Sequence, residues 1–161
     1  AQTQDTERAS GEFAAHRPPA AADLPETARA VQAAGADGLS LVNTIKGLAL
    51  DERTLEPKLG HELGGYSGSG LKPIALAAVY RCYRATGLPI VGMGGISTGR
   101  DALDFLAAGA SRIALGTILF GDPDAPGRVR RELAEELEAR GLAHATDATG
   151  LAHAGSTIPV D

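Results

Sequence analysis

Residues 89–96, PIVGMGGI, and residues 113–117, IALGT, decide the fold. Each contains a short apolar run that leads into glycine, at Gly94 and Gly95 in the first and at Gly116 in the second. The residues between the two stretches carry helical signals. A buried strand followed by a helix and a second buried strand predicts a right-handed parallel crossover and an α/β sheet. The sequence therefore predicts glycine-bearing turns at the carboxyl ends of two consecutive parallel strands.

The same alternation extends outward from these two runs. Residues 38–42, GLSLV, predict another buried strand, which ends at the polar pair Asn43 and Thr44. Residues 45–71 form a long glycine-rich connection, and a connection of this length is typical of a lid or binding loop. Apolar spacing, N-cap residues and terminal glycines predict four helices. The first helix is expected to begin at Asp23 and to reach about residue 34. The other three are expected at about residues 73–86, 98–108 and 126–140.

The order of these elements predicts part of a (β/α)₈ TIM barrel. A closed barrel needs roughly 200 to 250 residues, so this chain holds about three of the eight βα units. Residues 1–22 lack periodicity and are expected to be irregular or disordered. Residues 23–141 are expected to form the carboxyl-terminal part of the barrel, and residues 142–161 a flexible tail.

Composition excludes several function classes. A net charge of −5 argues against nucleic acid or an anionic membrane as partner, because both require clustered basic side chains. The single cysteine, Cys82, excludes an internal disulfide and a Cys₄ zinc site, and no apolar run approaches about 18 residues. The expected location is the cytoplasm. Four histidines are scattered without metal-ligand spacing and are expected to be exposed: His16, His61, His144 and His153.

The strand ends are where chemistry is expected, because barrel enzymes place their sites at the carboxyl ends of the strands. Gly94, Gly95 and Gly116 allow close backbone approach, and Thr117 adds a hydroxyl donor. This doubled pattern predicts a phosphate site made by backbone N–H groups and a helix N-terminus. The alternative is that these glycines serve tight turns alone, and the pattern does not identify the ligand.

Four motifs in order resemble the dihydroorotate dehydrogenase family over residues 24–122. They are residues 35–44, GADGLSLVNT, residues 64–73, GGYSGSGLKP, residues 89–96, and residues 108–117. The Gly-x-x-x-Asp pattern at residues 47–51 is more similar to the heterotetrameric NAD-linked class than to the membrane-bound quinone class.

The resemblance implies a flavin mononucleotide (FMN) cofactor and the oxidation of dihydroorotate to orotate in pyrimidine biosynthesis. The implied cofactor contacts are Val42, Gly68, Gly94, Gly95, Gly116 and Thr117, with the last four around the phosphate. Asn43 and Thr44 match the pair that hydrogen-bonds the pyrimidine, although a helix cap or Asx-turn is the alternative. The implied partners are a second subunit with FAD and an iron–sulfur cluster, and further copies of the complete chain.

Two features of the family pattern have no counterpart in this sequence. The family's catalytic base is a cysteine in the N-terminal half, so no catalytic residue is expected in this chain, and Cys82 is interpreted as an inert core residue. A lysine-bearing strand is replaced by residues 14–22, AAHRPPAAA. We interpret this switch as a truncation, a frameshift or a fragment. Lys72 precedes a predicted helix and is expected to be solvated.

The sequence leaves three hypotheses about function open. The first is that the chain is part of an enzyme that oxidises dihydroorotate. The second is that it is part of a related flavin barrel that acts on another pyrimidine, as in dihydropyrimidine dehydrogenases. The third is that it is a non-catalytic remnant. Asn43 and Thr44 suit the first two readings equally well. The missing base and lysine strand favour the third reading for the isolated chain.

Overall fold

The computed structural model describes residues 24–155. The predictions for residues 1–22, for Asp23 as a helix cap and for residues 156–161 lie outside the described residues.

Three parallel strands form the central sheet. They are β1 (Leu39–Leu41), β4 (Ile90–Met93) and β5 (Arg112–Ala114), in the order β1-β4-β5. Leu39 lies opposite Ile90, and Met93 lies opposite Ala114, so the carboxyl ends of all three strands meet at one edge. The predicted parallel α/β arrangement is confirmed, and three strands make an open segment of a barrel wall.

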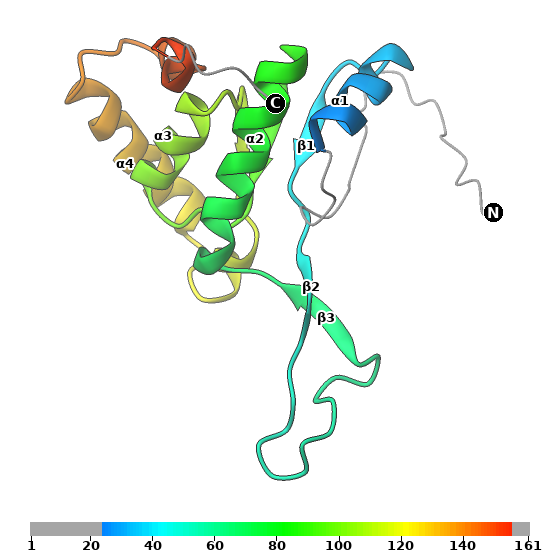
Figure 1. Ribbon diagram of the computed structural model, residues 1–161. Coiled ribbons are helices and arrows are strands. Elements are labelled where there is room, and N and C mark those ends of the chain that lie inside the picture. Colours follow the sequence, from blue (N-terminus) through cyan, green and yellow to red (C-terminus); the bar gives the residue numbers. More distant parts are fainter. Residues whose placement is uncertain (1–23, 156–161) are drawn as a thin grey trace.

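Within residues 24–155, four α-helices accompany the sheet: α1 (Leu24–Ala33), α2 (Lys72–Thr86), α3 (Gly99–Ala107) and α4 (Ala125–Glu138). Figure 1 shows α2, α3 and α4 in a row, with α1 beside β1. Helix α2 ends at Gly87, which has a φ of 66° that favours glycine. Helix α3 begins with the predicted capping box between Thr98 and Asp101. Local signals therefore set these helix ends.

The core lies between the sheet and α2 and α3. Phe105, Val79, Ile90 and Leu39 are fully buried. A Cβ on Gly92 of β4 would lie 2.7 Å from Cδ1 of Phe105, so this glycine lets α3 pack directly on the strand. Cys82 is also buried, as predicted, and burial raises the pKa of its thiol to about 11. A thiol that stays protonated at neutral pH is a packing residue.

The connection between β1 and α2 contains an antiparallel hairpin that the sequence analysis did not predict. Strand β2 (Ile45–Leu48) pairs with β3 (Leu63–Tyr66), and the 3-10 helix η1 (Ser69–Leu71) follows. The hairpin extends away from the helices (Figure 1). Several leucines and a tyrosine on it are exposed, so it lacks the alternating buried pattern that reveals a strand in a sequence: Leu48, Leu50, Leu55, Leu59, Leu63 and Tyr66.

Residues 142–155 differ from the expected flexible tail. They form two 3-10 helices, η3 (Ala145–Ala148) and η4 (Leu151–His153), and Ala148 is fully buried. The His153 ring stacks on Tyr80 with 4.0 Å between ring centroids, and its Nε2 lies 3.0 Å from the Ala108 carbonyl oxygen. The prediction that His153 is exposed is therefore wrong. The order in this segment was not predicted because its residues are mostly small. An alanine contributes little to an apolar pattern in the sequence, but it fits into a tightly packed contact.

Candidate functional site

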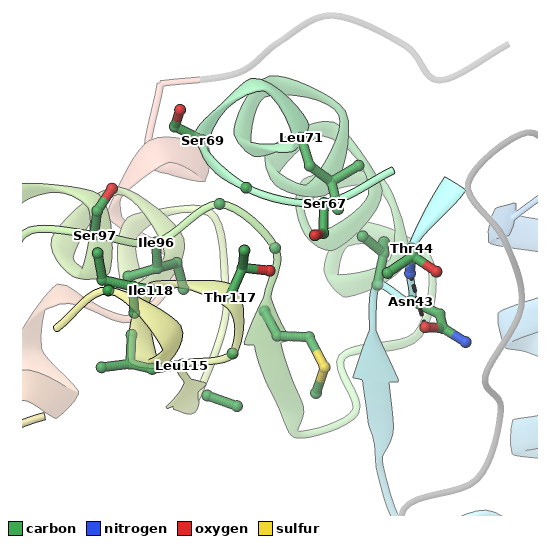
Figure 2. A pocket seen from close by; sticks show the side chains of 18 residues that line it. Asn43, Thr44, Ser67, Ser69, Leu71, Ile96, Ser97, Leu115, Thr117 and Ile118 are labelled. Atoms are coloured by element: carbon green, nitrogen blue, oxygen red, sulfur yellow. Dashed lines mark hydrogen bonds between the residues drawn. The ribbon is translucent and has the colours of Figure 1, made fainter. Parts of the chain in front are cut away.

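A cavity of about 420 Å³ lies at the carboxyl edge of the sheet. Its volume falls within the usual range of small-molecule sites, about 300–1,000 Å³. Figure 2 shows Ile96, Ser97, Thr117 and Ile118 on one side of the cavity and Asn43 on the other. All eight residues singled out from the sequence line it: Val42, Asn43, Thr44, Gly68, Gly94, Gly95, Gly116 and Thr117. The fold thus brings motifs that are far apart in the sequence together in one site.

The turn after β4 requires glycine at two successive positions. Gly94 has a φ of 121° and Gly95 a φ of 78°, a region that side chains with a Cβ rarely adopt. A Cβ on Gly95 would lie 2.7 Å from the backbone nitrogen of Lys72 and 2.8 Å from the Gly68 carbonyl oxygen. Since both neighbours are backbone atoms, Gly95 sets how closely this turn approaches the start of α2.

Gly116 and Gly68 present a different case, because protein packing does not require them to lack a side chain. A Cβ on either residue would meet no atom within 4 Å. Both residues line the cavity. The protein leaves the space next to these two backbone segments empty. A ligand in the cavity can therefore come close to the backbone there.

Backbone donors are available in the turns after both β4 and β5. Within residues 24–155, the N–H groups of Gly95 and Ile96 donate no hydrogen bond to the protein, and neither do those of Thr117 and Ile118. The last two open the 3-10 helix η2 (Thr117–Phe120), whose first N–H groups have no acceptor within the helix. Two pairs of unpaired donors therefore line one cavity.

The N–H groups that lead into α3 already have acceptors, and in the described part of the chain the free N–H groups at a helix start along the cavity are those of Thr117 and Ile118 in η2. The N–H groups of Ser97 and Thr98 each donate to Oδ2 of Asp101 at 2.9 Å. The N–H of Gly99 donates to Oε2 of Glu132 at 2.7 Å. Because these donors already have carboxylate acceptors, the anion-binding groups of this turn lie before the helix.

Asn43 and Thr44 lie at the end of β1 and are both exposed. The Asn43 Oδ1 accepts a hydrogen bond from the adjacent Thr44 N–H at 2.7 Å (Figure 2). This bond is neither an Asx-turn, which would involve the N–H two residues on, nor a helix cap, since β2 follows. This bond uses only the amide oxygen, and the amide NH₂ group remains a donor. A Cβ on Gly65 would lie 2.8 Å from Cβ of Thr44, so Gly65 lets the hairpin pack against the threonine.

Lys72 is not the solvated side chain that was expected. Its Nζ lies 2.5 Å from Oδ1 of Asp101 and 2.8 Å from Oδ2 of Asp104, and its side chain is 23% exposed. Burial acts to lower the pKa of Lys72, but its hydrogen bonds to the two aspartates outweigh burial and raise the pKa. Lys72 therefore ties the start of α2 to α3.

Asp101 holds several donors of the β4 turn. Burial acts to raise its pKa, but the hydrogen bonds from Lys72 and from the Ser97 and Thr98 N–H groups lower the pKa to about 2. A folded-state pKa below the ordinary value of 3.8 means that the ionised form stabilises the fold. This contribution, about 2 kcal/mol, is present above about pH 4 and is lost as the pH falls towards 2.

The variant Asp101→Asn is expected to lower the free energy of unfolding at pH 7 by about 1–2 kcal/mol. It should also remove the contribution of Asp101 to the loss of stability between pH 4 and 2, because its amide does not titrate, while Asp104 and Glu132, whose pKa values are also lowered, keep theirs. Urea unfolding at a series of pH values measures both effects. Asp124→Asn is the control, since Asp124 is exposed and its side chain makes no cap hydrogen bond. An Asp101→Asn protein with the same acid sensitivity as the wild type would contradict this account.

Other cavity residues were missed in the sequence because their side chains carry no motif of their own. They flank the glycines that were found, and this position is the signal that identifies them: Ser67, Ser69, Ile96, Ser97, Leu115 and Ile118. Among residues 24–155 no cluster of three His, Cys, Asp or Glu side chains is arranged to hold a metal ion. Within the same part of the chain, no helix has the length and apolar character to cross a membrane.

A glycine-lined cavity at the carboxyl edge of parallel βα units is the arrangement of a (β/α)₈-barrel enzyme site. The chain belongs to the dihydroorotate dehydrogenase family, whose model matches residues 12–137. The match begins inside the segment that was expected to be irregular. The resemblance found in the motifs is thereby confirmed.

Two curated relatives and one solved structure illustrate the similarity. A putative dihydroorotate dehydrogenase A (fumarate) of Solibacter usitatus is 51% identical over 115 residues, which are 71% of this chain and 38% of the relative. The catalytic subunit of dihydroorotate dehydrogenase B (NAD(+)) of Desulforamulus reducens is 45% identical, over 77% of this chain and 41% of the relative.

The solved structure is that of the Eimeria tenella enzyme in complex with ferulenol. It superposes with a TM-score of 0.72 at 33% identity, over 85% of this chain and 37% of that chain. The chain therefore spans about two fifths of the length of the relatives that it matches. Named relatives include both the fumarate and the NAD(+) type, so the similarity does not by itself distinguish the two.

Proposed function

We propose that this chain is the FMN- and pyrimidine-binding portion of an enzyme that oxidises dihydroorotate to orotate in pyrimidine biosynthesis. The observation that carries the proposal is that one cavity contains all eight residues that match the family's cofactor and substrate positions. Family membership supports the reaction, since the relatives are named dihydroorotate dehydrogenases.

The residues present fit the phosphate end of FMN. Four unpaired N–H groups, those of Gly95, Ile96, Thr117 and Ile118, supply donors, and the bare Gly116 leaves room for close approach. Gly94 and the Thr117 hydroxyl complete this end of the cavity, while Val42 and Gly68 line the rest of the proposed flavin site. When bound, FMN accepts a hydride from the substrate, which is chemistry that the side chains lack.

Asn43 and Thr44 are proposed to hold the pyrimidine. The Asn43 NH₂ group donates to a carbonyl or carboxylate oxygen of the substrate, and the Thr44 hydroxyl either donates or accepts. The internal bond from the Thr44 N–H to the Asn43 amide oxygen fixes which end of the amide faces the ligand. The pair therefore orients the substrate and does not move a proton.

Proton removal requires a group outside these residues. The described residues that line the cavity include hydroxyl and amide side chains but no carboxylate, imidazole, thiol or amine. Cys82 is buried and does not line the cavity, and its raised pKa keeps it protonated. We infer that a base from elsewhere in the complete enzyme takes the proton and that this chain alone does not turn over.

A fusion experiment tests this proposal. The N-terminal portion of the Desulforamulus reducens relative would be joined ahead of Leu24, and orotate formation measured with FMN, dihydroorotate and a dye as acceptor. The fusion is expected to form orotate and the unfused chain to form none. In the fusion, Asn43→Ala should raise KM for dihydroorotate about tenfold or more, since a hydrogen bond to a charged group is worth about 1.5–3 kcal/mol. A fusion that binds FMN without forming orotate would refute the assigned substrate.

We also propose an electron-transfer partner that carries FAD and an iron–sulfur cluster. The support is limited to one kind of relative, since the Desulforamulus reducens protein is named a catalytic subunit. Co-purification of this chain's complete enzyme with a second flavoprotein subunit tests it, and a complete enzyme that reduces fumarate alone would exclude it.

A further inference from the structure

Outside the cavity, a chain of charged side chains connects the turn after β4 to the turn after β5. The Gly99 N–H donates to Oε2 of Glu132 at 2.7 Å, and Nη1 of Arg128 donates to Oε1 of the same carboxylate at 2.7 Å. From its other side, Arg128 donates through Nε and Nη2 to Oδ2 of Asp122 at 3.0 and 2.8 Å. We refer to Gly99, Glu132, Arg128 and Asp122 as the ionic relay.

Each end of the relay is attached to a wall of the cavity. Gly99 follows the Gly95–Thr98 turn by one residue, and the unpaired N–H groups of Gly95 and Ile96 belong to this turn. Asp122 follows the second turn, and its own N–H donates to the Ile118 carbonyl oxygen at 2.9 Å. The relay therefore joins the two pairs of free donors through side chains that do not themselves line the cavity.

The approach of α3 to α4 makes this connection short. A Cβ on Gly99 would collide with the backbone of Glu132 and Leu133, so glycine allows the start of α3 to lie directly on α4. Both oxygens of Glu132 are then used, one for the backbone and one for Arg128. The planar guanidinium donates one hydrogen bond to Glu132 and two to one oxygen of Asp122, so its rigid plane constrains how the two carboxylates lie relative to each other.

The exposure of these ion pairs indicates that they position the two turns and contribute little to the stability of the fold. The side chains of Arg128, Glu132 and Asp122 are each about one-third exposed. Ion pairs that contact water contribute little to folding because solvent screens them. Strand pairing at Met93 and Ala114 sets the separation of the two turns where they begin. Beyond that point, the relay is the only side-chain hydrogen-bonded connection between them within residues 24–155.

We propose that Arg128 is a positioning residue that holds the two donor pairs at the separation required by a phosphate ester. This inference rests on the proposed function, because it assumes that a phosphate-bearing ligand occupies the cavity. Without the relay each turn keeps its own local hydrogen bonds and the strand pairing at its start, but the far ends of the two turns are no longer held to each other. The affinity for the phosphate end of the ligand falls, and the affinity for the remainder of the ligand does not.

The test compares FMN with riboflavin, which has the same ring and ribityl chain but no phosphate. Titrations followed by flavin fluorescence would use the wild-type protein, Arg128→Met and the control Arg130→Met. Arg130 lies on the same helix and is exposed, and it makes no ion pair in the part of the chain described. Arg128→Met is expected to weaken FMN binding about tenfold, or about 1.4 kcal/mol, and to leave riboflavin binding unchanged. Arg130→Met should change neither.

The outcomes separate this inference from the proposed function. A wild-type protein that does not prefer FMN to riboflavin refutes the phosphate site, and the inference falls with it. A wild-type preference for FMN that Arg128→Met preserves refutes the inference alone. Equal weakening of both ligands also refutes it, since that result indicates a general loss of packing.

A second variant keeps the test decisive if Arg128→Met does not fold. Glu132→Gln retains an amide oxygen for the Gly99 N–H but removes the charge that Arg128 contacts. It is expected to weaken FMN binding by a smaller factor, again without effect on riboflavin. An unchanged ratio of FMN to riboflavin affinity in a folded Glu132→Gln protein would overturn the proposal.

Discussion

Replacing Gly95 with alanine is expected to weaken FMN binding about a hundredfold, or about 2.7 kcal/mol. Two costs add at this position. The φ of 78° is unfavourable for a residue with a Cβ by about 1–2 kcal/mol. The new methyl group also meets the Lys72 nitrogen and the Gly68 oxygen, and relief of such overpacking typically costs about 1–3 kcal/mol. Because both neighbours are backbone, relief moves the turn or Gly68, and both line the cavity.

A matched variant separates strain from crowding. Gly141 has a φ of 69°, and a Cβ there would meet no atom within 4 Å. Gly141→Ala should therefore lower stability by about 1 kcal/mol without changing FMN affinity. Fluorescence titration and urea unfolding of both variants give the comparison. If Gly95→Ala binds FMN as tightly as Gly141→Ala does, the turn after β4 does not form the phosphate site.

Replacing Phe105 with alanine is expected to lower the free energy of unfolding by about 3–5 kcal/mol. Phe105 is fully buried, and it fills the space that Gly92 leaves on β4. Truncation removes the contact between α3 and the sheet and leaves a cavity that a glycine cannot fill. Since a folded domain is stable by only about 5–15 kcal/mol, a large part of the total would be lost.

The control is the other phenylalanine of this region, Phe120, which is 93% exposed. Phe120→Ala should change stability by less than about 0.5 kcal/mol. Urea unfolding monitored by circular dichroism measures both variants. Equal losses for the two phenylalanines would show that α3 does not pack on β4 as described.

The sequence was sufficient for the parts of the fold that local signals determine. The capping box of Thr98 and Asp101 and the terminal Gly87 fixed two helix ends correctly. The glycines after β4 and β5 indicated which sheet edge holds the cavity. This inference was possible because parallel strands necessarily bring their carboxyl ends to the same edge.

Features that depend on tertiary contacts could not be predicted in this way. No residue of β2 or β3 is buried, and their sequences, IKGL and LGGY, do not alternate apolar with polar side chains. Lys72 precedes a helix like many solvated lysines, and only the fold brings Asp101 and Asp104 to its amine. His153 is partly covered by the ring of Tyr80, which lies more than seventy residues earlier in the chain.

In the site, too, local features could be predicted from the sequence and tertiary contacts could not. Its glycines and its Asn43–Thr44 pair were visible in the sequence, because the backbone chemistry of a turn is local. The capping box of α3 was visible, but the contact of Gly99 was not, since its acceptor, Glu132, comes from α4. The sequence therefore did not show which N–H groups stay free, namely those of Gly95 and Ile96 before α3 and those of Thr117 and Ile118 at the start of η2.

The central claim is that the turns after β4 and β5 together form one phosphate site. Amide chemical shifts measured by NMR during titration with FMN, and separately with inorganic phosphate, test it most directly. The account predicts that Gly95, Ile96, Thr117 and Ile118 shift together with FMN and that phosphate alone shifts the same four amides. Shifts confined to one of the two turns, or to residues outside the cavity, would contradict it.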